Sequence, residues 1–250
     1  TGDVVAATLN ADLTVGAQLW STASQLDIQL AAGGSGRQIV TYDPSPGAFS
    51  KVPFSLSNLT DAQKQSLGWV DAGTDAAVTE KIDYIRGSSA NERPSGDFRA
   101  RPVADGRLGD IINSSPVFVG PPEALFRGGA AYPTGANSYA AFQAAQSRRA
   151  DRLYVSANDG MLHSIDPAND GNEVFAFIPN ATLVNSANTN ISELIEPSYS
   201  HQYVLDATPV VDDIYITGKQ SSKSWRTVLL GAFGAGGKGL FALDVTDPAI

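Results

Sequence analysis

Short apolar runs of β type, separated by glycine-containing turns, recur along this chain. Residues 153–166 read LYVSANDGMLHSID, and residues 228–244 read VLLGAFGAGGKGLFALD. Each stretch has an apolar run, a turn and a second apolar run that ends in Asp, which is the pattern of a β-hairpin. A weaker copy opens the chain at residues 2–20. Repeated hairpins of this kind are typical of a β-propeller, so we predict an all-β fold of that class.

The apolar pattern predicts further strands between the hairpins and a few helices that interrupt them. Residues 21–31 fit either a helical or a strand period. One helix is expected to start after Thr60 as N-cap, with Gln63 at the capping-box position, and a second to span residues 75–86 with Gly87 after its end. The remaining predictions are strands at 3–9, 17–20, 37–42, 116–119, 173–178, 206–211 and 213–217, a short helix within 138–149, and a polar loop at 180–199.

This pattern predicts one propeller domain over residues 1–250, with a helical insertion at about 43–98 and a loop insertion at about 121–150. The strands suffice for roughly four blades at about 40–50 residues per blade. The last repeat stops before it is complete, so we expect an incomplete or modified propeller and read the chain as a fragment. Insertions on a rigid scaffold often carry recognition.

The amino-acid composition excludes several classes of partner and site. Acidic residues number 26 against 17 basic ones, giving a formal net charge of −9. Nucleic acid is therefore not expected as a partner, because phosphate contacts need clustered Lys and Arg. The absence of cysteine excludes disulfides and thiolate metal sites. No apolar run approaches the roughly 20 residues that cross a bilayer, so no transmembrane segment is predicted.

One segment offers oxygen ligands for a hard cation. Asp166, Asn169 and Asp170 surround a glycine turn, as calcium ligands do, although their spacing is not that of an EF-hand. The alternative is an ordinary turn between strands, for which Asn, Asp and Gly are favoured.

Other motifs point to structure more than to chemistry. Gly234-Ala-Gly-Gly-Lys-Gly239 matches a dinucleotide fingerprint in letters, but a strand follows it where a helix is required, so we expect a hairpin loop with positive φ angles. His163 and His201 could be placed in a triad with Asp206, but no nucleophile-elbow motif accompanies them. We expect hydrogen-bonded positions instead, with Asp110 and Asp206 accepting backbone N–H bonds.

A series of phrases occurs in a recognisable order. They are Phe98-Arg-Ala-Arg101, Leu108-Gly-Asp-Ile-Ile-Asn-Ser-Ser-Pro116, Ser156-Ala-Asn-Asp-Gly-Met-Leu-His163, Tyr199-Ser-His201, Asp206-Ala-Thr-Pro209 and residues 234–248. Together they resemble the C-terminal propeller domain of the PilY/PilC family of type IV pilus assembly factors and tip-associated adhesins.

The resemblance implies a non-enzymatic, exported protein at the pilus tip, cell surface or outer membrane. Its implied partners are minor pilins and a host or abiotic surface, and its implied roles are pilus assembly, twitching motility and adhesion. The family often carries an N-terminal von Willebrand A-like domain and a calcium loop, which would lie after residue 250. No cofactor is expected within these residues, while calcium is expected in the intact protein.

A second family gives an alternative of another class. Residues 157–166, followed by Gly171-Asn-Glu-Val-Phe175, resemble the repeat of pyrroloquinoline quinone-dependent periplasmic dehydrogenases, with Phe175 in place of a tryptophan that docks one blade on the next. Quinoprotein-like blades are therefore expected in either case. The lack of cysteine argues against the typical enzyme, which carries a disulfide beside its cofactor.

Overall fold

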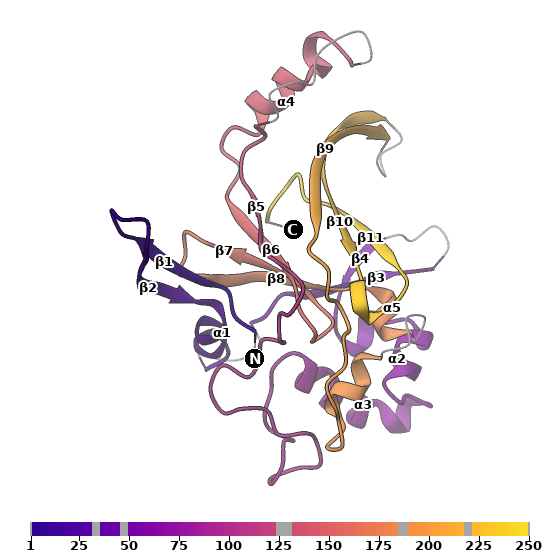
Figure 1. Ribbon diagram of the computed structural model, residues 1–250. Coiled ribbons are helices and arrows are strands. Elements are labelled where there is room, and N and C mark those ends of the chain that lie inside the picture. Colours follow the sequence, from indigo (N-terminus) through magenta and orange to yellow (C-terminus); the bar gives the residue numbers. More distant parts are fainter. Residues whose placement is uncertain are drawn as a thin grey trace.

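The computed structural model describes residues 2–31, 36–45, 50–123, 132–184, 190–217 and 222–249. Within these ranges the strands form three sheets, of two, six and three strands. Figure 1 shows the two larger sheets side by side, with helices gathered at one end and two arms projecting away from the body.

The six-stranded sheet has the order β4-β3-β8-β7-β6-β5. Its strands are β3 (Ile39–Asp43), β4 (Ser50–Pro53), β5 (Val117–Val119), β6 (Arg152–Ser156), β7 (Leu162–Asp166) and β8 (Asn172–Ile178). Strands β5 to β8 make an antiparallel meander of four strands, which is the make-up of one propeller blade. Strand β3 extends this blade by pairing parallel to β8, and β4 pairs with β3.

The three-stranded sheet holds the second hairpin. Its strands are β9 (Val210–Thr217), β10 (Lys223–Ala232) and β11 (Leu240–Asp244), in the order β11-β10-β9. Both hairpins of the repeated phrase are thus confirmed, since β6 pairs with β7 and β10 pairs with β11, each antiparallel. The two strands predicted at 206–211 and 213–217 are wrong as separate elements, because one continuous strand, β9, pairs with β10 along its whole length.

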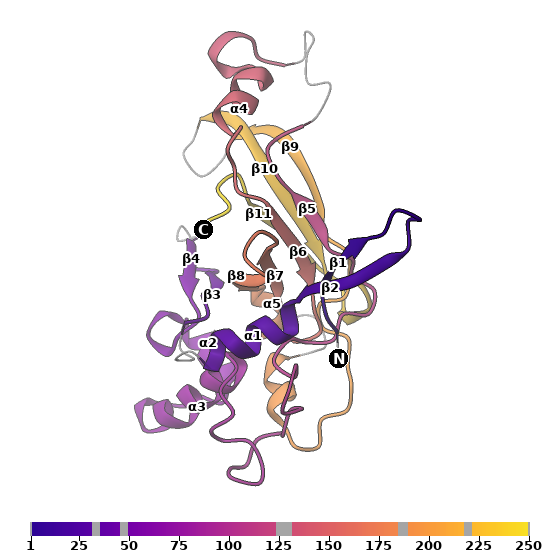
Figure 2. The ribbon, with the colours of Figure 1, turned by 90° about the vertical axis from the view of Figure 1, so that its left-hand side faces the viewer.

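The N-terminal copy is a two-stranded ribbon, β1 (Val5–Leu9) with β2 (Val15–Ser21), followed by helix α1 (Thr22–Ala31). The helical period therefore prevails over the strand period at residues 22–31. The ribbon projects from the body in both views (Figures 1 and 2). Its base covers the blade, because Val4 and Trp20 pack against Val155 and Ile165 of β6 and β7.

Two helices, α2 (Asp61–Ser66) and α3 (Asp75–Ile85), confirm the helical segment. Thr60 and Gln63 form the predicted capping box, and Gly87 follows α3 at a φ of +114°. Apolar side chains of α3 reach the six-stranded sheet, since Val78 and Ile82 share a core with Ile178 of β8. The segment predicted as an insertion also contains strand β4, which the pattern of residues 50–53 did not indicate.

Two shorter helices complete the described structure. Helix α4 (Tyr139–Ala145) lies beside the far ends of β9 and β10 in the projecting arm (Figure 2), with Ser138 as its N-cap. Helix α5 (Asn180–Leu183) follows β8. The polar loop predicted at 180–199 is partly wrong, because α5 and a 3₁₀ turn at 191–195 place Leu183, Ile191 and Ile195 in the core.

The two larger sheets meet as neighbouring blades. Ser115 N donates to Thr208 Oγ1 at 2.9 Å, which joins the segments leading into β5 and β9. Tyr154 and Phe175 of the first sheet share a core with Leu229 and Phe233 of the second. The propeller class is thus confirmed at the level of blades, and within the described residues these blades do not close into a ring.

Candidate functional site

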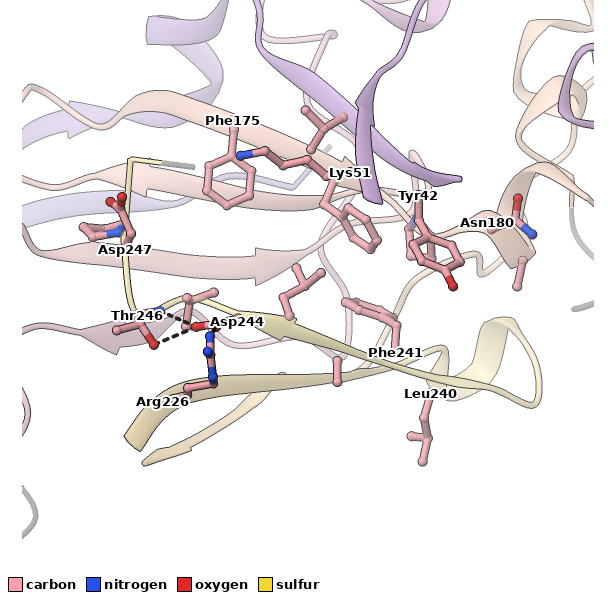
Figure 3. Close-up of a pocket in the computed structure, with 18 of the residues that line it drawn as sticks. Tyr42, Lys51, Phe175, Asn180, Arg226, Leu240, Phe241, Asp244, Thr246 and Asp247 are labelled. Atoms are coloured by element: carbon pink, nitrogen blue, oxygen red, sulfur yellow. Dashed lines mark hydrogen bonds and ion pairs between the residues drawn. The ribbon is translucent and has the colours of Figure 1, made fainter. Parts of the chain in front are cut away.

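A groove of about 1170 Å³ opens between the six-stranded and three-stranded sheets (Figure 3). We call it the two-sheet groove. Its walls come from β3, β4 and β8 on one side and from β10, β11 and the residues after β11 on the other. Its apolar lining is Val40, Tyr42, Phe175, Phe177, Phe233, Phe241, Leu243 and Val245.

Aromatic rings form the centre of the groove. Phe177 and Phe241 face each other across it, with ring centroids 5.4 Å apart, and Phe233 lies 6.4 Å from Phe241. Phe241 lies over Gly231, its partner on β10, where a Cβ atom would be 2.0 Å from the ring. In Figure 3, Phe241 points between the two sheets and Leu240 points away from them. Alternation along β11 therefore directs one face of the strand into the groove.

Charged groups gather at one end of the groove. Arg226 forms an ion pair with Asp244, and Thr246 donates to Asp244 Oδ1 through its hydroxyl at 2.6 Å and through its N–H at 3.1 Å. Partial burial acts to raise the pKa of Asp244, but the Thr246 bonds and the Arg226 charge outweigh it and lower the pKa below its usual value. Arg149 is held by the Gly120 carbonyl, to which its Nε donates at 2.8 Å.

Two strand edges border the groove. β11 pairs only with β10, and β4 only with β3, among the described residues. An edge strand presents N–H and C=O groups that can pair with a further strand. Combined with an aromatic lining, such an edge suits an extended polypeptide that lays alternate side chains into pockets.

A second polar centre is buried behind the first hairpin. Arg37 Nε donates to Glu173 Oε2 at 2.6 Å, and Arg37 Nη2 donates to Glu173 Oε1 at 2.7 Å. His163 lies between two carboxylates, with Nδ1 2.7 Å from Glu173 and Nε2 3.2 Å from Asp159. We call Arg37, Asp159, His163 and Glu173 the buried charge cluster.

The electrostatics of this cluster favour its charged form. Burial acts to lower the pKa of His163, but Asp159 and Glu173 outweigh it and raise the pKa to about 9. Burial likewise acts to raise the pKa of Glu173, whereas Arg37 and His163 hold it well below the usual range. The side chains of His163 and Glu173 are about 1–2 % exposed, whereas Asp159 lies at the margin of the cluster with 15% of its side chain exposed. The cluster links the N-terminal segment to the blade.

The three residues predicted as cation ligands lie in the turn between β7 and β8. Asp166 Oδ2 is 3.3 Å from Arg152 Nη1, and Asp166 Oδ1 accepts the Ala168 N–H at 3.0 Å. Asp170 and Gly171 have φ angles of +52° and +75°, as a tight turn requires. Among the described residues, no three His, Asp or Glu side chains form a group able to hold a metal ion. Calcium binding by Asp166, Asn169 and Asp170 stays a prediction.

The histidines do not form a triad with Asp206. His163 belongs to the buried charge cluster, and His201 Nε2 lies 2.8 Å from Asp110 Oδ2. Asp206 accepts the Asn113 N–H at 3.2 Å, as predicted. The prediction for Asp110 is wrong in detail, since its carboxylate meets His201 and the Asn158 amide instead of backbone N–H groups.

The glycine-rich phrase at 234–239 is the loop joining β10 to β11, with positive φ at Gly234 and Gly237, as expected. Sequence reasoning missed an aromatic cluster in the projecting arm. Trp225 lies 4.8 Å from Tyr139 and 5.5 Å from Tyr132 between ring centroids. The feature of the sequence that could have revealed this cluster is the tyrosine and phenylalanine content of residues 132–142. The tryptophan positions alone do not reveal it.

The segment that resembles a quinoprotein repeat packs between blades. Phe175 is 1 % exposed, lies 6.2 Å from Tyr154 between ring centroids, and lines the two-sheet groove. Gly171 lies against the Trp20 ring, where a Cβ atom would be 2.4 Å away. This packing is what a blade needs with or without a cofactor.

No helix in the described ranges is long and apolar enough to cross a membrane.

Comparison with known proteins gives a consistent family. The PilY1 beta-propeller domain matches residues 108–250. The type IV pilus biogenesis factor PilY1 of Pseudomonas aeruginosa strain PAK is 40% identical over 243 residues, which cover 94% of this chain and 19% of that protein. A PilY1 homolog of Xylella fastidiosa is 43% identical over 196 residues, covering 78% of this chain and 15% of its own length.

Among solved structures, the crystal structure of the P. aeruginosa PilY1 C-terminal domain is 48% identical, covers 45% of this chain and 19% of that one, and superposes with a TM-score of 0.33. The chain spans about a fifth or less of the length of these relatives. The matched propeller region takes in both hairpins of the repeated phrase and more than half of the residues. The chain therefore belongs to the PilY1 β-propeller family.

Proposed function

We propose that this chain acts in type IV pilus biogenesis as a non-enzymatic binding domain of an exported protein at the pilus tip or cell surface. The observation that carries the proposal is the family match over residues 108–250, which include β8, β10 and β11 of the two-sheet groove. Relatives of 37–43% identity are named type IV pilus biogenesis factors or homologs of one.

The partners proposed for the two-sheet groove are minor pilins. The groove offers a large aromatic surface beside β11, which pairs only with β10 among the described residues, and this suits a protein segment better than a small substrate. Its charged end, with Arg226 and Asp244, supplies polar contacts that fix orientation.

Adhesion to a host or abiotic surface is assigned to the projecting parts. The β1–β2 ribbon exposes Leu9, Leu13 and Val15 at 67–78%, and the arm that holds α4 extends beyond the sheets (Figure 1). Exposed apolar groups on a projecting element contact surfaces before the body of the molecule does. Calcium, which the family resemblance implies, is proposed for the intact protein.

The first experiment tests pilus association. Pili sheared from the source cells are analysed by mass spectrometry for peptides of this chain, with soluble periplasm as the reference fraction. Enrichment in the pilus fraction is the expected result. Recovery from the periplasm alone would overturn the proposal, and bound quinone in that fraction would support the dehydrogenase alternative.

The second experiment tests the β11 edge that borders the groove. Minor pilins of the source organism are captured on the chain and on the variant Ala242→Lys, which places a charge at the exposed edge strand β11. We expect capture by the wild type and at least about tenfold weaker capture by the variant, because a charged edge opposes strand pairing. Val103→Lys is the control, since Val103 is 94% exposed and is not among the residues that line the groove. Equal capture by both variants would contradict the assignment of the groove.

A further inference from the structure

A smaller cavity, of about 220 Å³, lies where the helical segment meets the first blade. Its lining runs from the end of α3 through residues 99–110 to the turn between β6 and β7. Three arginines line it: Arg99, Arg101 and Arg107. In a chain with 26 acidic and 17 basic residues, three arginines within nine positions make this cavity a local exception to the negative charge.

One of the three arginines has a structural role. Arg101 Nε donates to Glu92 at 2.7 Å, and its two terminal nitrogens donate to the carbonyls of Tyr84 at 2.9 Å and Ser88 at 2.5 Å. Every nitrogen of its guanidinium is thereby engaged. Arg101 holds the end of α3 against the segment that follows and has little capacity left for a ligand.

The other two arginines retain donors. Arg99 Nε donates to the Leu194 carbonyl at 2.7 Å, and its guanidinium lies 4.5 Å from the centroid of the Tyr199 ring. These contacts fix the plane of the group while its terminal nitrogens bond to no described residue. Arg107 uses Nη1 for the carbonyls of Pro102 and Val103, each at 3.2 Å, and no described residue accepts from its Nη2.

Counter-charges for these arginines are weak or absent. The nearest carboxylate to Arg107 is Asp27, with Oδ1 4.0 Å from Nε, and Arg99 has no carboxylate partner in the described structure. A guanidinium that is partly withdrawn from water without a carboxylate stabilises an incoming anion. Because the fork of a guanidinium matches a planar carboxylate in two parallel bonds, arginine favours this ligand class.

The other charged residues of the cavity favour a ligand with a low negative charge. Asp110 and Asp159 also face the cavity, and each already has a histidine partner, His201 and His163 respectively. Two carboxylates near the ligand repel a dianion such as sulfate more strongly than a monoanion. The cavity volume of about 220 Å³ suits a ligand of a few heavy atoms.

We propose that this cavity binds a small organic monocarboxylate, whose carboxylate is taken by Arg99 and Arg107. Arg101 and Glu92 keep the walls in place. The ligand lies at the junction of the helical segment and the first blade, so its binding stabilises that junction.

The test uses the full chain and the probe sodium lactate at constant ionic strength. Arginine Nε–H and backbone amide signals are followed by NMR during titration. We expect saturable shifts at the Arg99 Nε–H and at residues 106–109, with half-saturation in the millimolar range. The variant Arg99→Gln/Arg107→Gln is expected to weaken binding at least about tenfold, as the loss of charged hydrogen bonds predicts.

Two further measurements keep the proposal open to refutation. Arg148→Gln removes an exposed arginine in the projecting arm and should bind lactate as the wild type does. Sodium sulfate in place of lactate, on the wild type, should give weaker binding. Three results would each overturn the proposal: shifts that do not saturate, equal lactate binding by the double variant and the wild type, or sulfate binding as tight as lactate binding. The sulfate comparison uses the wild type alone, so it does not depend on whether a variant folds.

Discussion

The two hairpins of the repeated phrase share a pattern but occupy different surroundings. Strands β6 and β7 are covered on both faces, and Leu162 and Ile165 have no exposed surface. One face meets the second sheet, and the other meets the base of the β1–β2 ribbon. Strand β11 alternates between exposed and half-buried residues, with Leu240 77% exposed.

This difference shows that the local sequence pattern determines whether a hairpin forms. The residues packed around the hairpin determine how much it contributes to the stability of the fold. The first hairpin is embedded because residues from distant parts of the chain cover it. Among the described residues the second hairpin is covered on one face only, so substitutions on its exposed face should cost little stability.

The largest effect is expected in the buried charge cluster. Glu173→Gln removes a carboxylate shared by Arg37 and His163 and should lower the free energy of unfolding by about 3–5 kcal/mol, because two buried cations lose their partner. Asp244→Asn in the second hairpin breaks the more exposed pair with Arg226 and should cost no more than about 1 kcal/mol. Urea unfolding of both variants measures the two losses in the free energy of unfolding. Similar losses would contradict the difference between the two hairpins.

Apolar truncation should show the same contrast. Leu162→Ala empties a fully buried position and should cost about 2–5 kcal/mol, whereas Leu240→Ala changes an exposed side chain and should stay within about 0.5 kcal/mol. Urea midpoints with unchanged slopes give both values. A large loss for Leu240→Ala would mean that β11 is covered in solution.

A third test concerns the ring that lies over a glycine in the second hairpin. Gly231→Ala places a methyl group 2.0 Å from the Phe241 ring, so the ring must move within the groove at a cost of about 1–3 kcal/mol. Gly36→Ala serves as control, because no atom lies within 4 Å of the added Cβ there. Equal stability of the two variants would show that Phe241 is free to shift.

The last test concerns a pH dependence of the stability of the first hairpin. The pKa of His163 is raised from 6.5 to about 9 in the folded protein, so its stabilisation is complete below pH 6.5 and is lost as pH rises towards 9. The slope for one proton is at most about 1.4 kcal/mol per pH unit. Relative to His163→Gln, wild-type stability should fall over this window, and a parallel pH profile would contradict the charged form of His163.

Much of the fold follows from local signals in the sequence. The hairpins, the capping box of Thr60 and Gln63, and the glycine after α3 depend on contacts within a few residues, and all three appear as predicted. The parallel pairing of β3 with β8 has no local signal, since it joins segments more than 130 residues apart. Strand β4, which pairs only with β3 among the described residues, was missed as well.

The candidate site was less predictable than the fold. From the sequence, the aromatic residues of the groove are predicted only as strand residues. Alternation shows which side chains share a face of a strand, but it does not show what that face packs against. Likewise, Arg37 and Glu173 each looked like an ordinary strand residue, and only the tertiary structure brings them within 2.6 Å. Asp166, Asn169 and Asp170 are close in sequence, so their turn was foreseen as an alternative to calcium.

The pairing of β3 with β8 also sets an order of events during synthesis. Thr41 Oγ1 donates to the Ile178 carbonyl, 137 residues further along the chain. At about 5–20 residues per second, roughly 7–27 seconds separate the appearance of these two residues at the ribosome. During that interval the partners of strand β3 and Arg37 in the first blade have not yet been synthesised. Strand β3 can therefore join the six-stranded sheet only after the chain has been made through Ile178.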